Sequence, residues 1–139
     1  MSKPRRIRIA AELSRWAEVE DLLHFVELRN FTTKWRGKLE LDDDDLLELQ
    51  LAIMLAPKGN PVVPGTGSLR KLRFSPSRWR RGKRGALRVG YAYFEDLKIV
   101  LLGLVYPKNE QDDLTTSERE EIRKLLVEIH EHYSQNHYQ

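Results

Sequence analysis

Apolar and polar residues alternate along three segments in the middle of the chain, at Leu69–Ser75, Leu87–Phe94 and Lys98–Tyr106. Alternation of this kind, interrupted by glycine, proline and acidic turn residues, predicts three strands. His24–Phe31 is rich in aromatic and β-branched residues and predicts a fourth strand near the start of the chain. The pattern therefore indicates a sheet of about four strands.

Two helices are expected between the first strand and the other three. Thr32 or Thr33 offers an N-cap for a short helix that ends near Gly37. The acidic run that follows has Asp42 as a second cap and Asp45 three residues later, the spacing of a capping box. We interpret this run as the start of a buried helix that ends at Pro57, because consecutive helical carboxylates fan out around the axis instead of converging on a metal.

The chain closes with a third helix, which Thr115 and Glu118 open as another capping box. Its apolar stripe at i, i+3, i+4 and i+7 is formed by Ile122, Leu125, Leu126 and Ile129. Residues 1–22 are expected to form an arm and a short helix, 23–133 the main domain and 134–139 a tail. The order of elements predicts an α+β fold, with an antiparallel sheet of about four strands, helices packed on one face and a C-terminal helix.

Composition narrows the class of protein. The 139 residues are 40% apolar and contain no cysteine, which fits one domain without disulfides or thiolate metal sites. We find neither an apolar run of membrane-spanning length nor the apolar core of a signal peptide, so a cytoplasmic protein is expected. No metal or cofactor is expected, because His130 and His132 lie on different faces of the last helix.

Positive charge is concentrated in one stretch of the chain. Nine Lys and Arg residues and no acidic residue lie between Arg70 and Arg88, which leaves 15 basic residues against 21 acidic ones elsewhere. Such a concentration is typical of a surface that binds a polyanion, since neutralising phosphates dominates this kind of binding. The alternative is a basic loop that is merely solvated.

Strand alternation groups three of these cations. Lys71 and Arg73 share one face of their strand, and Arg88 shares a face with Gly90 and Ala92 on the next strand. If the two strands pair, the cations stand together beside small residues, which leaves room for a phosphate backbone. An ordinary sheet with a wet basic face is the alternative.

The glycine-rich run before these strands does not fit a nucleotide-binding loop. A Walker phosphate loop ends in Lys-Ser/Thr and leads into a helix. Here Gly65-Thr66-Gly67-Ser68 leads into a strand, and no such pair closes it. We therefore expect Pro64, Gly65 and Gly67 to form a turn that directs the next strand.

Three segments in order, PGTGSLRKLRF, RGKRGALRVGYAYF and LLGLVYPKNEQDDLT, resemble the HigB branch of the RelE/ParE superfamily of toxins from bacterial type II toxin–antitoxin systems. The resemblance covers roughly residues 24–130. It implies a compact RelE-like fold and a ribosome-dependent endoribonuclease, an mRNA interferase that inhibits translation as a metal-independent hydrolase. The implied partners are mRNA, the ribosome and a helix-turn-helix antitoxin.

Lys71, Arg73 and Arg88 match basic positions of that family and are the candidate catalytic residues. Candidate RNA contacts come from the basic stretch and from the polar residues after the last strand: Arg70, Arg78, Trp79, Arg80, Arg81, Lys83, Arg84, Lys108 and Asn109. The chain departs from the family in having Ser68 where a glycine is usual. It also has no clear match to the C-terminal catalytic tyrosine of some relatives.

A mechanism follows from these residue types. The RNA 2′-hydroxyl can attack the adjacent phosphorus if a base removes its proton and cations stabilise the phosphorane. Arg73 and Arg88 stay protonated and suit charge stabilisation, and Lys108 would position the strand. Lys71 is the candidate base, because neighbouring cations disfavour its charged form. The rival hypotheses are a ParE-like gyrase inhibitor and a non-catalytic RNA-binding protein.

Overall fold

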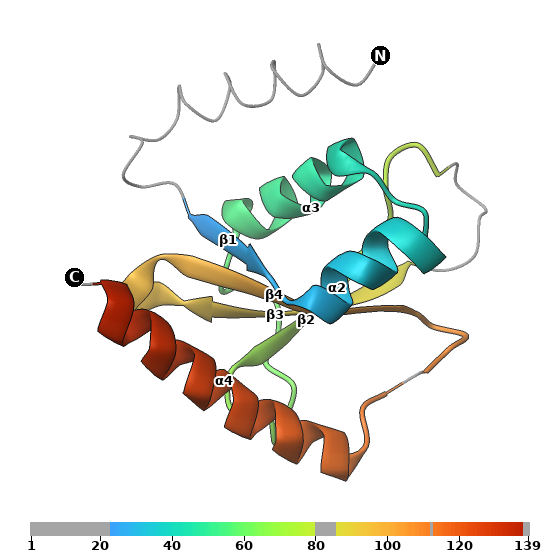
Figure 1. Cartoon of the computed structure of the whole chain (residues 1–139). Helices are drawn as coiled ribbons and strands as arrows, with labels where there is room; N and C mark the ends of the chain where they lie inside the picture. Colours follow the sequence, from blue (N-terminus) through green and yellow to red (C-terminus); the bar gives the residue numbers. More distant parts are fainter. Residues whose placement is uncertain (1–22, 80–85, 112, 138–139) are drawn as a thin grey trace.

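The computed structural model describes residues 23–79, 86–111 and 113–137, so the predicted arm at 1–22 lies outside it. Within these residues four strands form one sheet in the order β1-β4-β3-β2. Their bounds are β1 His24–Glu27, β2 Leu69–Phe74, β3 Leu87–Phe94 and β4 Ile99–Pro107. The α+β class and the last three strands are confirmed, each strand to within one residue (Figure 1).

The sheet is mixed, so the prediction of a wholly antiparallel sheet is wrong. β2 pairs with β3 and β3 with β4 in antiparallel fashion, but β1 runs parallel to β4, with His24 opposite Ile99. Strands joined by a short turn must run antiparallel, whereas a long connection leaves either direction open. More than 60 residues separate β1 from β4, so local pattern did not determine its direction.

The first predicted strand is too long, and the helix after it begins early. β1 ends at Glu27, and α2 (Arg29–Thr33) runs on into a π-helical turn, η2 (Lys34–Lys38). Its N-cap uses no side chain, which contradicts the predicted threonine cap. Phe31 and Trp35, one helical turn apart, stack in the core with ring centroids separated by 5.4 Å. The helix begins before the threonines because Phe31 must already be helical for both rings to reach the core.

The two predicted capping boxes are present. Before α3 (Asp43–Leu55), the backbone N–H groups of Asp42 and Asp45 each donate to the other's carboxylate at 2.9 Å. Before α4 (Thr116–His137), Thr115 and Glu118 exchange the same pair of bonds. α4 extends into the predicted tail, as far as His137. Local sequence signals therefore place the starts of both longer helices correctly.

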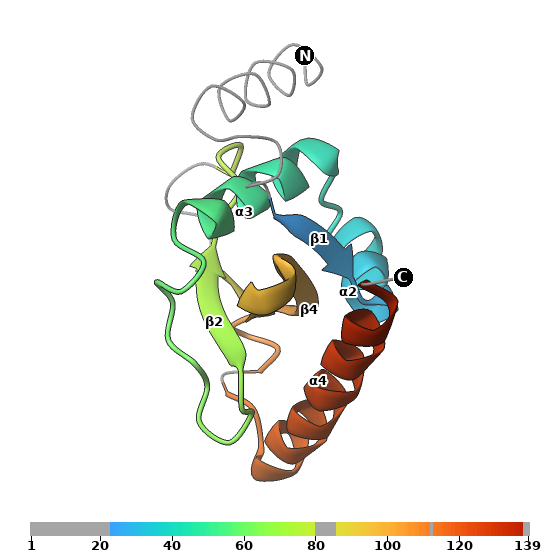
Figure 2. The same cartoon turned by 90° about the vertical axis from the view of Figure 1, so that its left-hand side faces the viewer.

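Helices cover both faces of the sheet, which corrects the prediction of one face. Figures 1 and 2 show α2 and α3 on one side and α4 on the other. One core joins Trp35 and Leu49 to Tyr91 of β3, and the second joins Leu126 of α4 to Phe94 at the end of the same strand. β3 is buried along nearly all its length on both faces, so both faces need cover.

The stripe predicted for α4 is only partly buried. Leu126 lies in the core, Ile122 and Ile129 pack at its margin, and Leu125 is 43% exposed. No helix in the described ranges is long and apolar enough to cross a membrane.

Candidate nucleic-acid interface

The pairing of β2 with β3 brings the three candidate cations onto one face of the sheet. Lys71 lies opposite Gly90, and Arg73 lies directly opposite Arg88. Side chains of directly opposed residues start about 5 Å apart, and like charges in such positions destabilise a sheet. The Arg73–Arg88 pair therefore concentrates positive charge at a point where an anion would be stabilising.

Arg88 is buried without a counterion among the described residues. The residue is only 5% exposed. Among the described residues its guanidinium makes one hydrogen bond, from Nη1 to the Ala86 carbonyl at 2.9 Å. A buried cation is costly unless it is paired. A guanidinium held in this way is prepared to accept a phosphate with little rearrangement.

Lys71 and Arg73 are more accessible. Lys71 is half-buried and Arg73 is exposed. A carboxylate lies nearby in Asp113: the Leu114 N–H donates to it and lowers the pKa of Asp113, and the charges of Arg119 and Lys71 lower it further. Asp113 is itself ion-paired with Arg119 at 3.0 Å and remains largely exposed. Lys71 is therefore near an acidic group that an incoming phosphate would have to displace or neutralise.

Tyr106 also lies at the candidate site, and the sequence analysis missed it. It lies opposite Arg88 on β4 and is 6% exposed. Strict alternation from Ile99 would place it on the other face, but the pairing skips Gly103, and the register shift brings Tyr106 round to the face of Arg88. It also lines a cavity of about 10 Å³ together with Lys71. Gly103 in the middle of a strand was the available signal for this bulge.

The glycine-rich run forms the predicted turn and positions β2. Gly65 and Gly67 have φ of 86° and 81°, a region that favours glycine. Between them Thr66 is fully buried, and its hydroxyl accepts a bond from the Leu69 N–H at 3.2 Å. Arg119 of α4 donates to the backbone of this turn at 3.1 Å. The turn thus fixes the beginning of the strand that carries Lys71 and Arg73 against α4.

Two of the predicted RNA contacts, Arg70 and Arg78, bond to other parts of the protein. Arg70 points to the opposite face from Lys71 and donates to the carbonyls of Lys58 and Asn60. Arg78 forms a two-pronged ion pair with the buried Asp45, with Nε 3.0 Å from Oδ1 and Nη2 2.8 Å from Oδ2. These bonds use Nη1 of Arg70, and both Nε and Nη2 of Arg78.

The remaining candidates fall into three groups. Trp79 packs against the core beneath α2 and α3, which is the structural role of a loop aromatic. Lys108 and Asn109 are exposed in the turn just after β4, at the end of the strand that carries Tyr106. The others lie outside the described residues: Arg80, Arg81, Lys83 and Arg84.

The turn after β4 is anchored to the π-helical turn η2. Glu110 accepts hydrogen bonds from Lys34 and Lys38, which lower the pKa of the Glu110 carboxyl. These two lysines therefore hold the turn against η2. In the described ranges no group of three histidine or acidic side chains is placed to hold a metal ion.

No known protein-family model matches this chain. Among solved structures it is similar to a double mutant of the Escherichia coli toxin RelE in the free state, with 14% sequence identity and a TM-score of 0.46. The match covers 66% of this chain and 88% of RelE.

Proposed function

We propose that this protein is an endoribonuclease toxin that cleaves mRNA on the ribosome, as its three HigB-like motifs imply. One observation carries the proposal: Arg88 is buried opposite Arg73, beside Lys71, with no carboxylate paired to it among the described residues. A phosphodiester would supply the missing negative charge. Three cations on one face of a rigid sheet suit phosphate binding better than general solvation.

The chemistry uses the RNA's own 2′-hydroxyl. Lys71 removes its proton, the oxygen attacks the adjacent phosphorus, and the bond from phosphorus to the 5′-oxygen breaks. Arg73 and Arg88 stabilise the charge that develops on the phosphorane. The departing oxygen takes a proton, and the Tyr106 hydroxyl is the candidate donor because Tyr106 lies opposite Arg88. The products are a 2′,3′-cyclic phosphate and a 5′-hydroxyl.

The ribosome has a clear physical role in this scheme. An in-line attack requires the 2′-oxygen, the phosphorus and the leaving oxygen to be held in one geometry. Such positioning is worth about 7–11 kcal/mol of the barrier. The described face offers cations and a hydroxyl but no deep cleft to bend RNA, so the decoding site would supply the geometry. An antitoxin that masks this face would silence the protein, and both partners place the function in the cytoplasm.

The test is to map RNA ends in a cell-free translation reaction, with and without ribosomes. We expect new 5′-hydroxyl ends within the reading frame, present only when ribosomes are present. Message that stays intact under both conditions would refute the nuclease and favour gyrase inhibition or simple RNA binding. Cleavage without ribosomes would refute ribosome dependence alone.

Matched variants on one strand make the test specific to the site. Arg73→Met should abolish the cuts, whereas Arg70→Met, on the opposite face of β2, should retain them once circular dichroism shows that it is folded. If Lys71→Met kept nearly the full rate while Arg73→Met did not, Lys71 would not be the base.

A further inference from the structure

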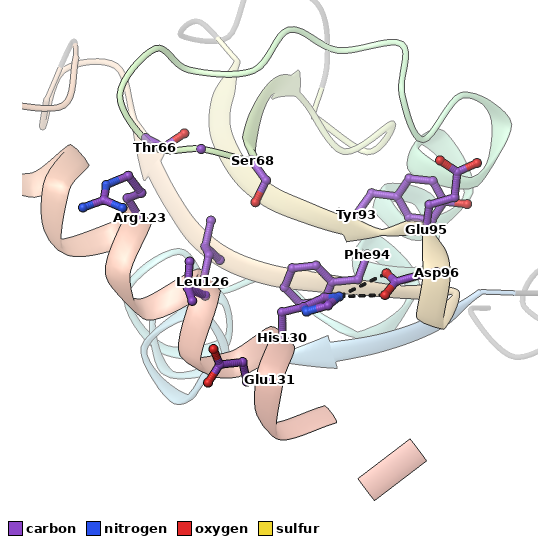
Figure 3. A pocket seen from close by; sticks show the side chains of 12 residues that line it. Thr66, Ser68, Tyr93, Phe94, Glu95, Asp96, Arg123, Leu126, His130 and Glu131 are labelled. Carbon is purple, nitrogen blue, oxygen red and sulfur yellow. Dashed lines mark hydrogen bonds and ion pairs between the residues drawn. The ribbon is translucent and has the colours of Figure 1, made fainter. Parts of the chain in front are cut away.

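A second concave surface lies between α4 and the far end of the β2–β3 pair (Figure 3). Its volume is about 740 Å³, within the range of binding clefts. Phe94 of β3 and Leu126 of α4 form an apolar floor, and Val127, 51% exposed, stands on its wall. An apolar floor with an exposed aliphatic side chain beside it is typical of a surface that buries a partner.

Charge is unevenly distributed around this groove. Three carboxylates lie toward one end, from Glu95 and Asp96 after β3 and from Glu131 on α4, and Arg123 lies at the other end (Figure 3). Three of these groups already have a polar neighbour among the described residues: Glu95 pairs with Lys58, Asp96 is hydrogen-bonded to His130, and Arg123 pairs with Glu120. These pairs are solvent-exposed and therefore weak, so a partner's charge can replace either member. The carboxylate end favours a basic group on the partner.

The shape of the groove favours a helix over an extended strand. From Arg123 to Glu131 its α4 wall spans nine residues, a rise of about 12 Å or two helical turns. Strand addition needs a free sheet edge, but the outer edge of β2 already bonds to the segment before it. The Lys71 N–H donates to Pro61 at 3.0 Å, and the Val63 N–H donates to Leu69 at 2.7 Å. Side chains, not backbone groups, are what this groove offers.

We propose that the groove docks an amphipathic helix from a partner protein. The helix presents apolar side chains at i, i+3 or i+4, and i+7 to Phe94, Leu126 and Val127. A lysine or arginine at one end of it meets the carboxylates of Glu95, Asp96 and Glu131. This surface is distinct from the proposed nuclease site, because Lys71, Arg73 and Arg88 do not line it. Phe94 shares a face of β3 with Arg88 but lies at the other end of the strand.

The docked helix would leave the cationic face open. Arg88 and Phe94 are six residues apart on β3, which corresponds to about 20 Å along the strand. A partner of two helical turns at the Phe94 end therefore does not reach Arg88. RNA and the partner helix can bind at the same time.

The experiment uses the full-length chain and synthetic peptides of about 14 residues, which present three leucines at helical spacing and two lysines at one end. A second peptide carries glutamates in place of the lysines. Binding is followed by amide chemical shifts in 15N spectra. We expect the lysine peptide to bind in the groove and to shift Leu126 and His130 without shifting Arg88. The glutamate peptide should bind more weakly.

Two substitutions on the same helix provide a matched pair. Val127→Glu places a charge on the groove wall and should weaken the lysine peptide about tenfold or more. Leu125→Glu is similarly exposed but does not line the groove, and it should change affinity less than about twofold. Glu131→Lys should shift the preference toward the glutamate peptide.

Several results would overturn the proposed docking site. Equal losses for Val127→Glu and Leu125→Glu, shifts centred outside the groove, or no binding of either peptide would each overturn the docking site. None of these results would touch the nuclease proposal, which is read from RNA ends. A loss of peptide affinity in Arg73→Met, which removes a charge from the β2–β3 face and does not line the groove, would overturn the claim that the two surfaces act separately.

Discussion

Arg78 and Arg88 come from the same basic stretch of sequence, yet the fold uses them in opposite ways. Arg78 is partly exposed, but its guanidinium is held by a carboxylate of Asp45 whose side chain is only 2% exposed. Arg88 is itself buried, and within the described residues its guanidinium hydrogen-bonds only to a backbone carbonyl. The first arginine neutralises a buried acid. The second is a buried charge with no acidic partner in the part of the chain that the structure describes.

This difference shows why counting charges cannot identify a binding surface. Nine cations in one stretch indicated a polyanion, but Arg70 and Arg78 are spent on carbonyls and a carboxylate. What distinguishes a ligand-ready cation is the missing partner, and only the fold reveals it. A buried arginine without a counterion contributes little to stability, because an apolar residue of similar size would usually be as stable or more so.

The largest effect should separate the two arginines in activity. Arg88→Met removes a charge that stabilises the transition state, and we expect the ribosome-dependent cleavage rate to fall by about 10²–10³-fold. Arg78→Met should change the rate less than about threefold, provided that the variant is folded. The check is single-turnover cleavage of a message on stalled ribosomes. Equal losses of cleavage rate in the two variants would contradict the special role proposed for Arg88.

Stability should show the reverse order. Asp45→Ala removes the acceptor of Arg78 and half of the capping box of α3, and we expect the free energy of unfolding to fall by about 3 kcal/mol. Roughly 1 kcal/mol of this is the cap and about 2 kcal/mol the charged hydrogen bonds, reduced because Arg78 is half-exposed. Arg88→Met should be neutral or slightly stabilising.

Urea unfolding followed by circular dichroism measures both variants. A loss of several kcal/mol in Arg88→Met would show that Arg88 is a structural cation after all. An unaffected Asp45→Ala would show that its ion pair contributes nothing.

Much of the fold could be predicted from the sequence because its signals are local. The capping boxes at Asp42 and Thr115 and the alternation in β3 each depend on residues within one turn or one strand. The direction of β1 and the early start of α2 could not be predicted in this way. Both depend on contacts between distant segments, such as the burial of Phe31 and Trp35 against the sheet.

The residues of the candidate site also differ in whether local sequence could predict them. Alternation was enough to place Lys71, Arg73 and Arg88 on one face, because β2 and β3 are regular and adjacent. Tyr106 was lost because the unpaired Gly103 reverses the alternation, and the position of a bulge depends on the register between strands. Asp45 as the partner of Arg78 was also out of reach, since the two lie 33 residues apart.

Salt dependence offers a smaller but cleaner test of the same comparison. Each cation that contacts a phosphate releases about one counterion, so Arg73→Met should reduce the slope of log affinity against log salt by about 0.7–0.9 for RNA. Arg78→Met should leave the slope unchanged. The measurement is fluorescence anisotropy with a labelled single-stranded RNA at several salt concentrations. Equal slope changes would place Arg78 on the RNA-binding surface despite its ion pair.

The smallest effect concerns Asp42, the capping residue of α3, whose carboxyl lies near Arg78. The Asp45 N–H donates to the Asp42 carboxylate and lowers the pKa of Asp42 below its unfolded value, with a further contribution from the Arg78 charge. A lowered folded-state pKa contributes stability that is fully present above the unfolded value, about pH 4, and is lost as the pH falls through the folded value. Stability should therefore decline below about pH 4.

Asp42→Asn tests this contribution, because asparagine still caps the helix but does not titrate. We expect a shallower loss of unfolding free energy between about pH 5 and pH 2 than in the native chain, and nearly equal stability at pH 7. Urea unfolding across that range measures it. If the two curves ran parallel, the Asp42 carboxylate would not be coupled to folding. If the Asp42→Asn curve were the flatter of the two below about pH 4, the Asp42 carboxylate would be one source of the acid sensitivity of the fold.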